Sequence, residues 1–111
     1  MFDMMKMMGK MKEVQAKVKE AQERLGDMTT TAEAGGGMVK AVANGKRQLV
    51  SLEIDPELVN KDDVEMLRDL IVAATNKALE QAEEMSKEEL KKSTEGLIPN
   101  IPGFDLSGFT G

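Results

Sequence analysis

The sequence predicts a dimeric α+β fold of the order α-β-β-β-α, in which a three-stranded antiparallel sheet lies between two long helices. Two long stretches carry apolar residues at helical spacing, and the stretch between them is rich in glycine and β-branched residues. An Asn-Gly dipeptide at 44–45 separates two short apolar runs, which is typical of a β-hairpin. We expect a single domain over residues 1–95, followed by an irregular Pro/Gly tail over 96–111.

The first predicted helix covers residues 1–25. Its apolar residues recur at alternating spacings of three and four, which is the pattern of a coiled-coil-like seam. Gly26 follows the last apolar residue and favours the end of a helix there. The seam consists of Met4, Met7, Met11, Val14, Val18, Ala21 and Leu25.

The sheet is predicted over residues 28–54. Three consecutive threonines at 29–31 favour an extended strand, and the three glycines at 35–37 predict a turn after it. A two-residue turn at 44–45 would place Val39 opposite Val50 and Ala43 opposite Lys46. Because side chains alternate between the two faces of a strand, one face should carry the core or dimer contacts. On this face we expect Val39, Ala41, Val50, Leu52 and Ile54.

The second predicted helix covers residues 62–95, after Asp55-Pro56 has ended the sheet. Asn60 or Asp62 would cap its first turn. Leu67 and Ile71 belong to its apolar stripe and complete the predicted core or dimer contacts. Small residues at 73, 74, 78 and 82 would let a neighbouring element approach the helix closely.

Composition restricts the chemistry that the chain can perform. The 111 residues include no cysteine and no histidine, which excludes disulfides, zinc sites of the usual kind, a thiol nucleophile and an imidazole base. No stretch has the apolar length of a membrane span. We therefore expect a cytoplasmic protein that is not an enzyme, with no cofactor, no metal, no membrane and no small-molecule substrate. Clustered methionines near the start permit Cu(I) binding, but the helical phase of the seam explains them better.

Charge is unevenly distributed along the chain. The net charge is −5, yet residues 1–25 carry six basic and four acidic residues, and residues 55–95 carry six basic and twelve acidic residues. The first helix is therefore the predicted site of phosphate contact. Lys6 and Lys12 have no acidic residue four positions away on either side, whereas Glu13 and Glu20 precede Lys17 and Arg24 at the spacing of helical ion pairs. The candidate contacts are Lys6, Lys10, Lys12, Lys17, Lys19 and Arg24.

Three segments in order carry a resemblance to a known family. They are Gly-Gly-Gly-Met-Val-Lys-Ala-Val-Ala-Asn-Gly at 35–45, Ile-Asp-Pro at 54–56, and Asp-Leu-Ile-Val-Ala-Ala-Thr-Asn-Lys-Ala at 69–78. Together with the Met-rich opening, they resemble the YbaB/EbfC family of bacterial nucleoid-associated proteins over nearly the whole chain. The resemblance implies a homodimer of α-β-β-β-α subunits with the sheets at its centre and projecting terminal helices that contact double-stranded DNA.

Two other functions compete with binding of nucleoid DNA with low sequence specificity. An acidic protein-interaction module would hold a partner protein through its apolar helix seams, and the net charge of −5 favours it because that charge repels phosphate at long range. A membrane-surface helix over residues 1–11 would use the methionines as its apolar face.

Overall fold

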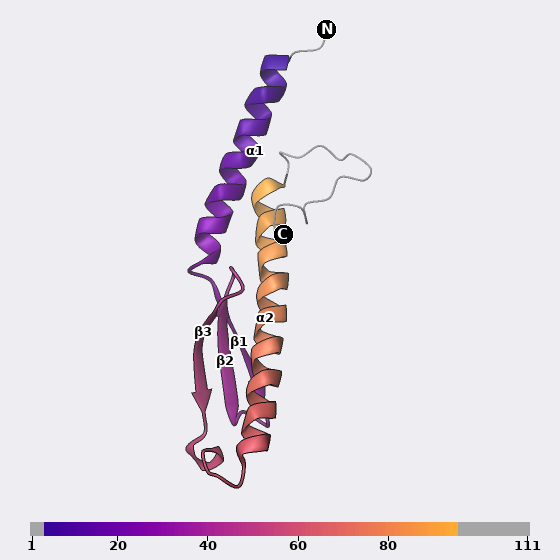
Figure 1. Cartoon of the computed structure of the whole chain (residues 1–111). Helices are drawn as coiled ribbons and strands as arrows, with labels where there is room; N and C mark the ends of the chain where they lie inside the picture. The colour runs from indigo at the N-terminus through magenta and orange to yellow at the C-terminus, as the bar shows by residue number, and fades with distance from the viewer. Residues whose placement is uncertain (1–3, 96–111) are drawn as a thin grey trace.

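The computed structural model describes residues 4–95, and its element order confirms the predicted α-β-β-β-α fold. The chain is a rod of 74 × 25 × 17 Å, with α1 extending beyond one end of the sheet (Figure 1). The predicted tail over 96–111 lies outside the described residues. The elements are α1 (Met4–Leu25), β1 (Thr29–Ala34), β2 (Val39–Asn44), β3 (Leu49–Ile54), the short 3₁₀ helix η1 (Pro56–Leu58) and α2 (Val64–Thr94).

The sheet is antiparallel, with the strand order β1-β2-β3. The turn predicted at glycines 35–37 joins β1 to β2, and Ala34 pairs with Val39 on either side of it. All three glycines have a positive φ, of 64°, 66° and 92°. Residues with a side chain rarely adopt this region, so the triple glycine is what permits the turn.

The predicted pairing of β2 with β3 is wrong. Val39 pairs with Ile54 instead of Val50, and Ala43 pairs with Leu49 instead of Lys46. A register irregularity at Ala43 leaves Val50 outside the regular pairing. The side chain of Val50 is 56% exposed, because it lies on the outer strand and α2 does not cover it.

Asn44 explains the difference, because it closes a longer loop than a two-residue turn. Its amide donates to the Gln48 carbonyl at 3.0 Å, and its Oδ1 accepts from the amides of Lys46 at 2.9 Å and Gln48 at 3.2 Å. Arg47 has a φ of 61°, and its amide donates to the Asn44 carbonyl at 3.0 Å. A three-residue loop that ends in a left-handed residue is another common form of hairpin.

The tip of this hairpin docks on the end of α1. The Gly45 amide donates to the carbonyls of Leu25 at 2.8 Å and Met28 at 2.9 Å. Carbonyls in the last turn of a helix lack partners within the helix, so the hairpin satisfies one of them. A Cβ on Gly45 would lie 2.7 Å from Leu25 Cδ2 and 2.8 Å from the Leu25 carbonyl oxygen, so only glycine fits this approach.

α2 packs along β1 and β2 through a row of small side chains and has little contact with β3. Ala74, Ala78 and Ala82 are fully buried, as are Val39 and Ala41 of β2. Residues four apart lie on the same side of a helix, and their methyl groups let the helix approach the sheet closely. The predicted role of these small residues is confirmed for 74, 78 and 82, whereas Ala73 is exposed.

The C-terminal half of α1 runs antiparallel to the C-terminal half of α2 (Figure 1). Val18, Ala21 and Leu90 form a buried cluster there, with Val14 packed at its edge. Burial of a valine or leucine side chain contributes about 1.5–3 kcal/mol. A partly exposed ion pair such as that of Arg24 with α2 contributes about 0–1 kcal/mol, so apolar packing is what holds the two helices together.

The start of α2 differs in detail from the prediction. The helix begins at Val64, and its N-cap residue Asp63 makes no side-chain capping bond. Asn60 instead stabilises the preceding turn, since its Oδ1 accepts from the amides of Asp62 at 2.9 Å and Asp63 at 3.1 Å. A side-chain acceptor of this kind satisfies amides that would otherwise lack partners.

The contact of Gly45 with α1 predicts a large effect of a small substitution. Gly45→Ala should lower the free energy of unfolding by about 1–3 kcal/mol, because the new methyl group would overlap Leu25. Gly9→Ala is the matched control: a Cβ at Gly9 meets no atom within 4 Å, so it should raise stability by about 0.5–1 kcal/mol. Urea unfolding measures both, and equal stability of the two variants would contradict the docking.

Candidate nucleic-acid interface

The first ten residues of α1, here called the arm, extend beyond the packed body of the protein. All residues from Met4 to Glu13 are exposed. Contact between the helices ends near Val14, which is the last partly buried residue toward the N-terminus within the described part of α1. The arm continues a helix that is already nucleated by its packed half, and this favours the helical state in a segment that would be too short alone.

The six candidate contacts lie in two rows along α1. At about 100° per residue, Lys6, Lys10, Lys17 and Arg24 fall within a sector of about 40°. Lys12 and Lys19 form the second row, about 120° from Lys6. The apolar seam lies between the two rows on the side that packs on α2. Both rows are exposed along their whole length.

The ion pairs of α1 differ from those expected from helical spacing. Lys17 pairs with Glu20 at 3.7 Å instead of Glu13. Arg24 pairs with Glu89 of α2 at 3.1 Å and donates to Ser93 Oγ at 2.7 Å, instead of pairing with Glu20. Glu89 is only 19% exposed and therefore less well solvated than a carboxylate on the open face of α1. Arg24 thus links the two helices.

The other four lysines are not equivalent. Lys10, Lys12 and Lys19 make no ion pair within residues 4–95. Lys6, in contrast, has an interaction partner. Lys12 therefore makes no ion pair within the described residues, as its sequence context predicts, and the same holds for Lys10 and Lys19.

The arm also exposes an apolar face. Met4, Met7 and Met11 continue the seam and are 67%, 48% and 61% exposed, and Met8 lies beside them at 57%. Met5, at 84%, lies next to the row of Lys12 and Lys19. Methionine side chains are flexible and polarisable, so such a face adapts to partners of different shape. Within the described residues, no group of carboxylate, thiol or imidazole side chains is placed to hold a metal ion.

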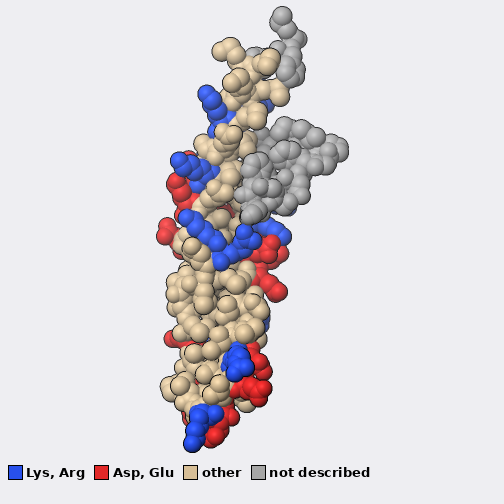
Figure 2. Space-filling model, viewed as in Figure 1, with Lys and Arg blue, Asp and Glu red and all other residues tan. Residues whose placement is uncertain are grey.

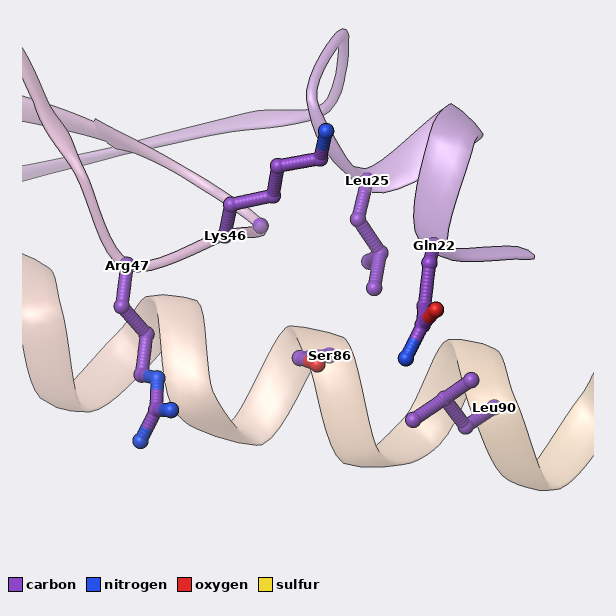
Figure 3. A pocket seen from close by; sticks show the side chains of 7 residues that line it. Gln22, Leu25, Lys46, Arg47, Ser86 and Leu90 are labelled. Carbon is purple, nitrogen blue, oxygen red and sulfur yellow. The ribbon is translucent and has the colours of Figure 1, made fainter. Parts of the chain in front are cut away.

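A pocket of about 270 Å³ lies where α1, the hairpin tip and α2 meet (Figure 3). Its polar lining comes from Gln22, Lys46, Arg47 and Ser86, and its apolar lining comes from Leu25, Gly45 and Leu90. No carboxylate is among these seven residues. The site residues predicted from sequence omitted the two cations of the tip, although residues 35–54 carry three basic residues and one acidic residue.

Basic side chains gather on the upper part of the molecule. Figure 2 shows blue groups along α1 and a band of them at the level where α1 meets the hairpin, whereas red groups are frequent along the lower part of α2. Red groups also lie among the blue ones along α1, so the division of charge between the first helix and the acidic second helix is partial. No helix within residues 4–95 is both long enough and apolar enough to cross a membrane.

The residues predicted for the core or dimer fall into three groups. Val39 and Ala41 are fully buried within the single chain. Leu52, Ile54, Leu67 and Ile71 are partly buried and pack against the core. Val50 is exposed in the single chain.

Comparison with known proteins agrees with this geometry. The profile of the YbaB/EbfC DNA-binding family matches residues 1–97. A nucleoid-associated protein of Thermoanaerobacter pseudethanolicus is 53% identical over 103 residues, covering 93% of this chain and 91% of the relative. A nucleoid-associated protein of Moorella thermoacetica is 50% identical over 104 residues, covering 94% and 98%.

A solved structure has the same fold. The crystal structure of the uncharacterised protein HP0035 from Helicobacter pylori matches with a TM-score of 0.70 and 28% identity, over 79% of this chain and 92% of that one. The family profile matches most of the chain, and the two relatives are identical to it at about half of the aligned positions. Both findings establish its family membership. This chain belongs to the YbaB/EbfC DNA-binding family.

Proposed function

We propose that this protein is a homodimer that binds duplex DNA with low sequence specificity and catalyses no reaction. In this proposal it acts in the bacterial nucleoid, where it influences nucleoid organisation and gene expression. The observation that carries the proposal is the exposed basic arm of α1, which extends beyond the packed body. The names of the relatives, which are nucleoid-associated proteins, support the location.

The helix α1 suits phosphate contact because its basic residues are spaced along its length. Lys6 and Arg24 are 18 positions apart, which is about 27 Å along the helix axis. Lysine rows on both sides of the seam would contact phosphates, and phosphate contacts position a protein without reading sequence. Binding by this means weakens steeply as the salt concentration rises, because counterions are released from the DNA.

Low specificity follows from the small number of arginines. Bidentate contact with guanine is the commonest specific contact to a base, and the chain has only Arg24, Arg47 and Arg68 for it. Arg24 is engaged with Glu89 and Ser93. Arg68 lies in α2 at the end of the rod farthest from the arm, so it would not reach a duplex bound there.

In the proposed dimer, the second subunit would cover β3. α2 leaves β3 largely uncovered, and Leu49 and Val50 are 46% and 56% exposed. An outer strand with apolar side chains is a site for pairing with another chain. A second subunit here would bury these side chains and leave both arms accessible.

The lysines of the arm are predicted to determine the salt dependence of DNA binding. In Lys10→Ala/Lys12→Ala, the slope of log K against log salt concentration should become less steep by about 0.9 for each phosphate that the variant no longer neutralises. The control is Lys61→Ala/Lys77→Ala, which removes two exposed lysines outside the arm and should leave the slope unchanged. Fluorescence anisotropy with a labelled duplex at several salt concentrations measures both.

Two measurements separate DNA binding from binding of a protein partner. If the wild-type protein binds no duplex at low salt, the proposed function is wrong. A protein partner recovered in equal amount with and without nuclease treatment would instead favour a protein-interaction module, for which the exposed methionines of the arm are the available surface.

A substitution of Val50, which is exposed in the single chain, tests the proposed dimer. Each chain has a mass of 12.1 kDa, and sedimentation equilibrium should give about twice this value for the wild type. Val50→Asp should give one chain mass, because a buried unpaired carboxylate opposes association. The control Met5→Asp lies on the arm and should stay dimeric. A wild-type mass of one chain at micromolar concentration would exclude the dimer.

A further inference from the structure

The tip of the β2–β3 hairpin presents two cations at the base of α1. Lys46 and Arg47 are both exposed, and they follow Gly45, which is hydrogen-bonded to the end of α1. Their side chains point in different directions, that of Lys46 toward the end of α1 and that of Arg47 across α2 (Figure 3). The band of basic groups at this level is visible in Figure 2.

The backbone of the tip is held in place from two directions. The side chain of Asn44 accepts from the amides of Lys46 and Gln48, and its Nδ2 donates to Gln48 Oε1 at 2.8 Å. On the other side, the Gly45 amide donates to the end of α1. Since the loop is ordered before any ligand arrives, binding through it has a smaller entropic cost than binding through a mobile loop.

Arg47 occupies a backbone conformation that disfavours its residue type. Its φ is 61°, and it is the one residue other than glycine with a positive φ within residues 4–95. Glycine or asparagine suits this loop position better, because the left-handed region brings Cβ close to the next carbonyl oxygen. A residue that keeps an unfavourable backbone conformation at an exposed position is a candidate for a functional role.

Lys46 and Arg47 differ in how they contribute to the stability of the fold. A Cβ on Gly26 would lie 3.4 Å from Lys46 Cε and 3.6 Å from Lys46 Nζ, so this ammonium lies over the turn that follows α1. A cation near the C-terminal end of a helix is stabilising, which gives Lys46 a structural role. Arg47 points away from the helix end, and its conformation does not favour stability. Its side chain has an interaction partner among the described residues, yet the residue remains exposed at the tip.

We propose that Arg47 makes a second contact with the DNA backbone, at the base of α1, so that a bound duplex extends from the arm to the hairpin tip. This proposal rests on the proposed function and adds a contact outside the two lysine rows. The absence of a carboxylate from the pocket lining leaves an adjacent phosphate unopposed. The planar guanidinium donates two parallel hydrogen bonds to phosphate, which a lysine does not.

The test uses a substitution that removes the charge and suits the backbone. Arg47→Asn should have a melting temperature equal to or above that of the wild type, because asparagine tolerates the left-handed region. Its affinity for duplex DNA should fall about three- to tenfold near 0.1 M salt, and the salt slope should become less steep by about 0.9 for each phosphate that the variant no longer neutralises. Arg47→Lys should keep the slope of the wild type, and so should Lys40→Ala, whose lysine is paired with Glu33 at 3.8 Å on the sheet.

Each outcome decides between the two proposals. A wild-type protein that binds no DNA overturns the proposed function, whatever the variants do. Wild-type binding with an unchanged slope in Arg47→Asn overturns only the second contact. An equally reduced salt slope in Arg47→Asn and Arg47→Lys also overturns it, because Arg47→Lys retains the positive charge.

Discussion

The position of α1 depends on the close contact between the tip of the hairpin and the last turn of that helix. Gly45 approaches Leu25 so closely that a Cβ would lie 2.7 Å from a side-chain carbon, and its amide hydrogen-bonds to the carbonyl at the helix end. A second anchor is the apolar packing of Val18 and Ala21 against Leu90 of α2. With these two anchors, the basic arm extends in one direction from the sheet, which is what a contact along a duplex requires.

The core is thin, and this constraint connects the fold with the proposed assembly. Phe2, Phe104 and Phe109 are the only aromatic residues, and all lie outside the described part of the chain. Between sheet and helix the core is built largely from alanine, which permits a close approach but buries little apolar area for each residue. A small domain with such a core commonly gains stability by association. The uncovered face of β3 offers the surface for it.

Sequence patterns predicted the elements of this fold better than their contacts. The heptad seam, the threonine run and the glycine turn are local signals, and each corresponds to an element in the structure. The pairing of Val39 was wrong because Asn44-Gly45 favours a two-residue turn, whereas the docking of Gly45 on α1 involves residues far away in sequence. Arg24 was matched with Glu20 for the same reason: helical spacing does not reveal a partner 65 positions away.

The two anchors of α1 also restrict how the length of this chain can change during evolution. One residue inserted into α2 between Ala82 and Leu90 would turn Leu90 by about 100° and shift it by about 1.5 Å. Two residues added to each strand of the second hairpin would move its tip by about 7 Å. After either change alone, α1 could no longer make both contacts at once. Insertions and deletions should therefore collect at the opposite end of the rod, in the segment 55–63, which contacts neither anchor.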